Sequence, residues 1–254
     1  HRHKFPDKLS LDIEYSYLSD RNILVDFFEK EYREGRETET YAYLKKVWNN
    51  HSFTLLGRPR INDFQNQVEY LPQGIYRVIW EPLWHDSLGS LYFSSNTEFS
   101  YVKKRDDKDN ITEWNNSSTF RTDWENTLFY RIMAGPIHLM PFTTGRISYF
   151  EKGVEEDNLF RASGAIGIEA ATHFYRTYNV ENKFFDVNKL LHIFTPHFRY
   201  QWIYGNSVEP DELVQFDSVD SLDKMQEIQV LLTNRLRTIR NNSVVDFLFF
   251  EVKF

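Results

Sequence analysis

The chain contains no cysteine among its 254 residues. Disulfide bridges, thiolate nucleophiles and thiolate metal sites are therefore excluded, although this absence indicates no particular compartment. Long apolar runs are also missing: Phe247–Phe250 lies between Asp246 and Glu251, and a membrane helix needs about 20 apolar residues. Together with a mean hydropathy of −0.56, this excludes a helical membrane protein. A membrane barrel stays open, because half of every barrel strand faces a polar lumen.

Positive charge is not in excess, since 30 Lys and Arg stand against 37 Asp and Glu, a net charge of −7. A nucleic-acid binder would need a basic face, so we expect no nucleic-acid partner. Only 10 Gly and 8 Pro occur, which excludes a low-complexity or collagenous chain. No apolar segment follows His1–Lys4, so we expect no signal peptide within this sequence. We expect either a cytosolic protein or a mature or excised piece of a longer one.

Aromatic residues are abundant, at 17% of the chain. The stretch Leu190–Tyr204 shows how they are placed, because alternate residues of a strand point to opposite faces. One face carries Phe194, Phe198, Tyr200 and Trp202, and the other carries polar residues around Arg199. Its fifteen or so residues exceed the five or six that are usual in soluble sheets. A tilted strand that crosses a bilayer places about 9–11 residues in the hydrocarbon.

The same alternation recurs along the chain and predicts an all-β fold. We expect about eleven strands in an antiparallel meander: Leu11–Tyr17, Thr38–Trp48, Ser52–Arg60, Gly74–Pro82, Leu88–Lys103, Thr119–Ile132, Ile137–Phe150, Phe160–Tyr178, Leu190–Tyr204, Ile228–Arg237 and Val244–Phe254. A loop with a short helix, ending at Gly35, is predicted within Asp20–Gly35, and solvated loops are predicted at Lys104–Asn110 and Gly205–Asp223. Strand length and aromatic content favour a single transmembrane β-barrel, or a large section of one, over residues 1–254.

Two sets of residues follow from this interpretation. Candidates for a polar, lumen-facing surface are Arg121, Arg131, Arg146, Arg161, His197, Arg199, Arg235 and Arg237. Candidates for the lipid-facing surface are Trp124, Phe194, Phe198, Tyr200 and Trp202. Guanidinium groups suit phosphates and carboxylates. The simpler interpretation is that each arginine pairs with an acidic residue of a neighbouring strand.

No pattern points to catalysis, a metal or a cofactor. His173, His192 and His197 lie near one another in sequence, but no Ser-His-Asp order or helical His pair accompanies them. Asp217, Asp220 and Asp223 recur every three residues without the glycine and terminal glutamate of a calcium loop. We therefore expect no enzyme activity, no metal and no cofactor, with the aspartates in a solvated loop. Two alternatives stay open: another outer-membrane porin or ligand channel, and a soluble β-sandwich that binds a carbohydrate or a protein partner.

A series of motifs resembles the barrel of the LptD family, the lipopolysaccharide-assembly or organic solvent tolerance proteins of the Gram-negative outer membrane. The series is Ser19–Leu24 with Glu37–Leu44, Val68–Pro72, Gly135–Phe142 with Arg146–Tyr149, and Leu191–Tyr200 with Gln215–Asp220 and Thr233–Leu236. The blocks span most of the chain in the family's order, and each is weakly specific by itself.

The resemblance implies a role in cell envelope biogenesis. A very large antiparallel barrel would be plugged by a lipoprotein partner similar to LptE and fed by a periplasmic bridge similar to LptA. It would pass lipopolysaccharide to the outer leaflet, among outer-membrane lipid, through a seam between its first and last strands. The family's periplasmic N-terminal domain and its cysteines are absent from this sequence, and eleven strands are too few for its barrel. We therefore expect an excised section of the barrel.

Overall fold

The computed structural model describes residues 1–254 apart from 21, 29, 31–32, 34–37, 109–116 and 241. All strands in this part belong to one antiparallel sheet of 13 strands, which confirms the all-β meander. The two-sheet sandwich among the alternatives is wrong, because all strands within the described residues are joined in this one sheet and no second sheet forms there. No helix of the described part is both long and apolar enough to cross a membrane.

The first half of the sheet begins with short strands and lengthens along the chain. Its elements are β1 (Arg2–Lys4), β2 (Leu9–Glu14), the helix α1 (Ile23–Phe27), β3 (Tyr41–Trp48), β4 (His51–Arg58), β5 (Gln67–His85) and β6 (Gly89–Arg105). The turn at Asn49–Asn50 and the short helix were predicted, whereas Gly35, predicted to end that helix, lies outside the described residues. Strand β5 has 19 residues, twice the predicted length. Bulges near Tyr70 and Val78 interrupt its pairing with β6, and these irregularities hid its alternation.

The second half consists of the longest hairpins. Its elements are β7 (Ser118–Ala134), β8 (Ile137–Lys152), β9 (Asp157–Thr172), β10 (Phe174–Asn182), β11 (Val187–Tyr204), the 3₁₀ turn η1 (Pro210–Glu212), β12 (Met225–Arg240) and β13 (Ser243–Lys253). The predicted strands end within four residues of these bounds, and Phe160–Tyr178 covers both β9 and β10. The sharp turn between β7 and β8 uses Gly135 with a positive φ of 62°, a conformation that glycine adopts without steric cost.

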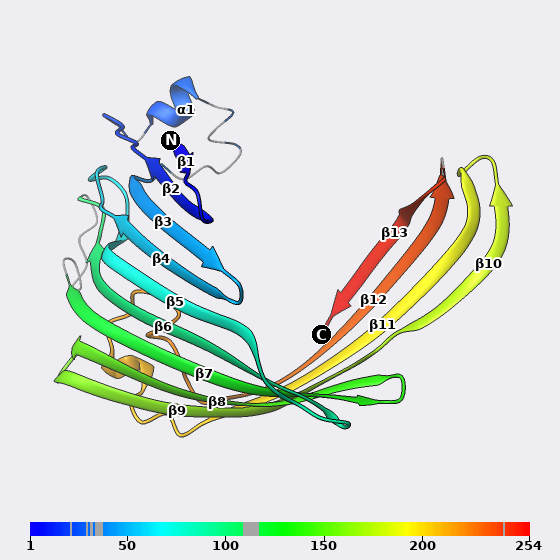
Figure 1. The fold of residues 1–254 in the computed structure, drawn as a ribbon. Coiled ribbons are helices and arrows are strands. Elements are labelled where there is room, and N and C mark those ends of the chain that lie inside the picture. Colours follow the sequence, from blue (N-terminus) through cyan, green and yellow to red (C-terminus); the bar gives the residue numbers. More distant parts are fainter. Residues whose placement is uncertain (21, 29, 31–32, 34–37, 109–116, 241) are drawn as a thin grey trace.

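The predicted long strand Phe160–Tyr178 is interrupted once, at His173. Ala171 pairs with His197 and Phe174 pairs with Phe194, so β9 and β10 follow one register along β11. Strand β8 accompanies β9 only as far as Thr172. Beyond that point β10–β13 continue without β5–β8 beside them, and they form a separate arm (Figure 1).

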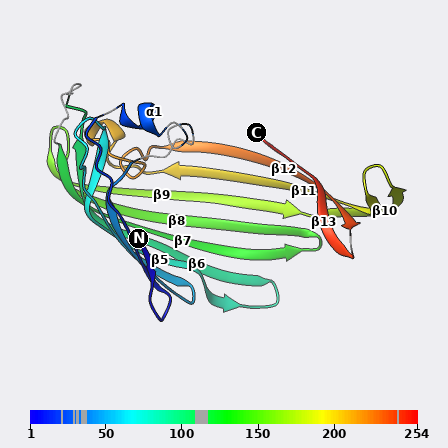
Figure 2. The same cartoon turned by 90° about the horizontal axis from the view of Figure 1, so that it is seen from above.

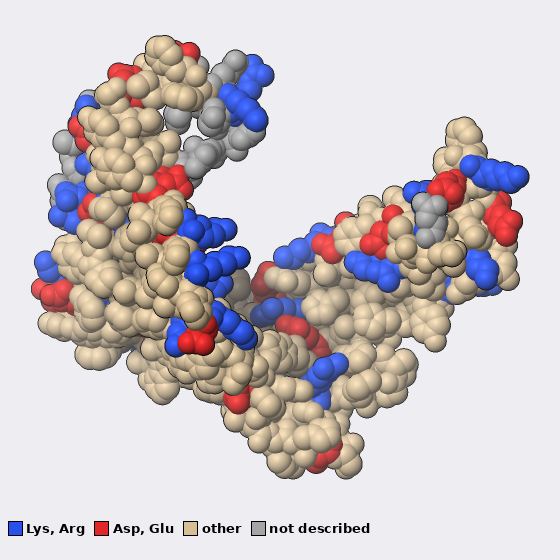
Figure 3. Space-filling view, turned by 45° about the horizontal axis from the view of Figure 1, so that its top comes forward, with Lys and Arg blue, Asp and Glu red and all other residues tan. Residues whose placement is uncertain are grey.

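The sheet curves into an open trough, with β1–β4 on one arm and β10–β13 on the other (Figure 1). Pairing runs from β1 to β13, and in the described part these end strands do not pair with each other, so the sheet is not closed. Seen from above, the long strands cross the molecule side by side, and the β11–β12 connection lies near the end of the trough (Figure 2). Lys, Arg, Asp and Glu gather in the hollow between the arms (Figure 3).

Candidate functional site

The strand registers assemble one continuous polar face across the sheet. Directly paired residues share a face, and the register joins Arg146 to Glu125 and Ser163, and Arg199 to Glu169. All eight predicted polar candidates fall on this face, here called the inner face: Arg121, Arg131, Arg146, Arg161, His197, Arg199, Arg235 and Arg237. The sheet therefore brings together residues that are more than 100 positions apart.

The five aromatic candidates lie on the opposite, outer face. Trp124 pairs with Ile147, Phe198 with Ala170, and Trp202 with Ile166. The side chains of Trp124, Phe198 and Trp202 are exposed, and Phe194 and Tyr200 are half-buried. The outer face is thus apolar and aromatic over the middle of the long strands.

The most enclosed group of the inner face is the guanidinium of Arg121, which has no solvent exposure. It donates five hydrogen bonds, as many as a guanidinium has N–H groups. Nη1 lies 2.8 Å from both carboxylate oxygens of Asp220, Nη2 lies 3.1 Å from Glu98 Oε1 and also contacts Asp217, and Nε lies 3.1 Å from Ser100 Oγ. A buried charge costs several kcal/mol unless it is paired and fully hydrogen-bonded, and this guanidinium meets both conditions.

Asp217 and Asp220 belong to the connection between β11 and β12, residues 205–224, here called the anchored loop. Asp220 also accepts hydrogen bonds from the backbone N–H groups of Phe216 and Asp217, at 2.9 and 3.0 Å. The Tyr70 hydroxyl donates to Asp217 at 2.7 Å. Arg161 donates to the Val219 carbonyl at 2.7 Å and to Ser148 Oγ at 3.2 Å. Side chains from β5, β7 and β9 thereby hold one loop against the sheet, and β6 supplies further partners of Arg121.

The prediction of a solvated loop is wrong for Asp217 and Asp220, whereas Asp223 is exposed as predicted. Asp220 is fully buried, and apolar loop residues Val208 and Leu213 pack against Phe150 on the sheet. Burial tends to raise the pKa of Asp217, but the hydrogen bond and positive charge of Arg121 outweigh it, so that pKa lies below its usual range. The spacing of three residues reflects a turn in which Asp220 N–H donates to the Asp217 carbonyl.

Along the rest of the inner face, arginines pair with acidic residues of neighbouring strands, as the simpler interpretation predicted. Arg146 Nε lies 2.8 Å from Asp123 Oδ1, and Arg199 Nη1 lies 3.3 Å from Glu169 Oε1. Arg237 Nε lies 2.8 Å from Asp246 Oδ1, and Arg235 lies 3.9 Å from the same carboxylate. Positive charge on this face is therefore largely balanced locally.

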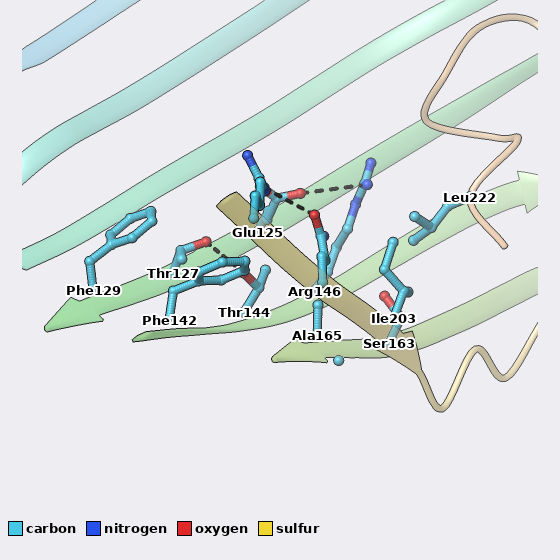
Figure 4. A pocket seen from close by; sticks show the side chains of 13 residues that line it. Glu125, Thr127, Phe129, Phe142, Thr144, Arg146, Ser163, Ala165, Ile203 and Leu222 are labelled. Carbon is cyan, nitrogen blue, oxygen red and sulfur yellow. Dashed lines mark hydrogen bonds and ion pairs between the residues drawn. The ribbon is translucent and has the colours of Figure 1, made fainter. Parts of the chain in front are cut away.

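A cavity of about 210 Å³ opens on the inner face beside the anchored loop. Its polar wall includes Arg146, Arg199 and Gln201, its apolar wall includes Phe129 and Phe142, and Leu222 of the loop closes one side (Figure 4). Phe142 lies over Gly167, where a Cβ atom would come within 2.3 Å of the ring. This close approach is what lets the aromatic ring lie flat beside the strands.

The histidines divide between the two faces. His197 Nε2 lies 3.6 Å from Glu169 Oε2 on the inner face, and His173 Nδ1 lies 2.9 Å from Thr195 Oγ1. His192 contacts Asn234 instead, on the outer face. Within the described ranges, no three His, Cys, Asp or Glu side chains gather closely enough to hold a metal ion.

Sequence reasoning missed several residues of this site. Phe129 and Phe142 belong to the inner face, and their spacing from Arg121 and Arg146 by even numbers of residues was a usable signal. Tyr70, Glu98 and the burial of Asp220 carried no such signal, because the contacts depend on where the loop folds. A scan against protein-family models gives no match for this chain, and a search of curated proteins gives none either.

Proposed function

We propose that this chain is part of an outer-membrane β-barrel that exports lipopolysaccharide to the outer leaflet. One observation carries the proposal: charged residues occupy one face of a curved sheet and exposed aromatic residues occupy the other. An aromatic outer face in lipid and a charged inner face in a wet lumen are typical of a membrane barrel. That the cargo is lipopolysaccharide is inferred from the motif series that resembles the LptD family.

Strand length supports a membrane location. Strands β5–β9, β11 and β12 have 16–19 residues each, and a tilted transmembrane strand needs about 9–11. Further strands, from the same or another chain, would have to close the sheet. On the family resemblance, the partners are a plug lipoprotein similar to LptE and a periplasmic bridge similar to LptA. The barrel would carry out no covalent chemistry.

Two substitutions on one strand test the assignment of the faces. Phe198→Lys places a charge on the outer face of β11, and Thr195→Lys places the same charge on the inner face, three residues away. A lysine at the bilayer midplane on the lipid side costs about 2–4 kcal/mol. We therefore expect Phe198→Lys to lower the amount of protein assembled in the outer-membrane fraction several-fold, and Thr195→Lys to leave it unchanged. Equal effects would contradict the proposal.

The cargo needs a separate measurement. Producing the chain within its complete protein in cells depleted of their own export barrel should restore lipopolysaccharide at the cell surface, measured by labelling intact cells. Membrane assembly without restored surface lipopolysaccharide would instead favour another outer-membrane channel. A chain that stays monodisperse in water without detergent would contradict both, because so large an exposed aromatic surface should aggregate.

A further inference from the structure

We propose that the inner-face cavity beside the anchored loop binds a single, uncharged sugar ring. The cavity is lined by hydroxyl, amide and charged groups on one side and by two phenylalanine rings on the other (Figure 4). Its volume of about 210 Å³ is below the roughly 300–1,000 Å³ of pockets for drug-sized ligands. A space of this size suits one ring of a saccharide.

The balance of charge around the cavity favours a neutral ligand over an anion. Three charged side chains line the cavity, those of Arg146, Arg199 and Glu125. Arg146 lies within ion-pair distance of Asp123 and Glu125, and Arg199 lies within ion-pair distance of Glu169. Each guanidinium is therefore already paired with at least one carboxylate. A phosphate would have to compete with these carboxylates, whereas sugar hydroxyls can both donate to the carboxylates and accept from the guanidinium groups.

The uncharged polar groups fit the same chemistry. Thr127 and Thr144 hydroxyls lie 2.9 Å apart, and either can donate. Gln201 accepts from Arg199 at 3.0 Å, which fixes the orientation of its amide. Two small residues, Gly164 and Ala165, line the cavity between these groups. These hydroxyl and amide groups can donate to and accept from the hydroxyl groups around a pyranose ring.

The apolar wall would receive the C–H face of the ring. Phe129 and Phe142 have their centroids 6.1 Å apart, and the Arg199 guanidinium lies 5.3 Å from the centroid of the Phe142 ring. Phe129 is itself stacked on Trp80, at 4.7 Å between centroids. Both rings are therefore held in place before a ligand arrives, and a preorganised wall reduces the entropic cost of binding.

The sugar could be free or could be part of a glycolipid cargo. Only the second source rests on the proposed function; the sugar site itself does not. Binding of methyl α-glucoside, methyl α-mannoside and methyl α-galactoside would be measured by saturation-transfer NMR on the full chain. The detergent must be a zwitterionic one without a sugar head group. The binding energy that a ligand of this size usually gains per non-hydrogen atom corresponds to a Kd on the order of 1 mM.

Substitutions of residues that line the cavity test whether the glycosides bind there. Thr144→Val and Gln201→Leu remove polar groups without large changes of shape, and each should weaken glycoside binding by roughly three- to tenfold. Thr122→Val, on the outer face of the neighbouring strand β7, is the matched control and should leave the Kd unchanged. The assignment is overturned if none of the three glycosides binds, if both variants bind as well as the original chain, or if inorganic phosphate binds more tightly than the glycosides.

A competition experiment separates the two sources. If intact lipopolysaccharide and its delipidated saccharide both displace the bound glycoside, the site accepts the sugar of a glycolipid. If the glycoside binds at this cavity but lipopolysaccharide does not displace it, the sugar site stands and its ligand is a free sugar; the export function is then decided by the surface-labelling experiment alone.

Discussion

The contact between Arg121 and Asp220 predicts that one substitution will release the anchored loop and leave the sheet intact. Asp220→Asn keeps the shape of the side chain but removes its charge. The amide nitrogen cannot accept a hydrogen bond, whereas in the original chain Asp220 Oδ2 accepts from Arg121 and from the Phe216 and Asp217 amides. The substitution therefore breaks a buried ion pair and part of the turn.

The magnitude follows from what remains around Arg121. Removing one partner of a buried pair costs about 3–5 kcal/mol. Glu98 and Asp217 still face the guanidinium, so we expect the lower end, about 3 kcal/mol. At 1.4 kcal/mol per factor of ten, this raises the population of the released loop roughly a hundredfold or more.

Hydrogen exchange followed by mass spectrometry would measure the release. Peptides within residues 205–224 should exchange roughly a hundredfold faster in Asp220→Asn, while peptides from β8 and β9 keep their original rates. Asp211→Asn, an exposed position of the same loop, should change exchange little. Unchanged loop exchange in Asp220→Asn, or equal acceleration in both variants, would refute the anchoring role.

Three further measurements test the contacts of the anchored loop and the contact between Phe142 and Gly167. Because the folded-state pKa of Asp217 is lowered from 3.8, its stabilising contribution is present above that value and is lost as the pH falls through the lowered pKa. Burial raises the pKa of Asp220 in the same loop, so the original chain is compared with Asp217→Asn, which keeps Asp220. The difference in loop exchange between the two should stay constant from pH 7 to 5 and shrink only below about pH 4. Tyr70→Phe removes a hydrogen bond to a carboxylate, which should lower the free energy of loop opening by about 1.5–3 kcal/mol. Loop exchange should therefore become faster, but less so than in Asp220→Asn. An acceleration equal to or larger than that of Asp220→Asn would contradict this order. Gly167→Ala places a Cβ 2.3 Å from the Phe142 ring and 2.4 Å from the backbone carbonyl oxygen of Tyr200, and it should lower the free energy of unfolding by about 1–3 kcal/mol. Gly145→Ala meets nothing within 4 Å and should cost less. Equal urea midpoints would show that the ring and the β11 backbone both move aside at little cost.

The sequence by itself predicted the strands and the two faces with good accuracy. Alternation depends only on the local geometry of a strand, so Arg199 and Phe198 are assigned to opposite faces without knowledge of any neighbour. The same rule placed Arg121, Arg146 and Arg161 on one surface before their pairing partners were known. It failed in β5, where bulges shift the alternation, because a bulge is set by pairing with the next strand and leaves no period in the sequence.

Only the tertiary structure decided the role of the anchored loop. Arg121 and Asp220 are 99 residues apart, and an acidic loop has the composition of a solvated one. Its burial depends on the curvature of the sheet and on four strands that bring Tyr70, Glu98, Arg121 and Arg161 to one place. The open edges of the sheet and the cavity beside the loop were likewise settled by the fold, because both depend on which segments meet across the trough. Local alternation fixes which way a side chain points, and long-range pairing fixes what it meets there.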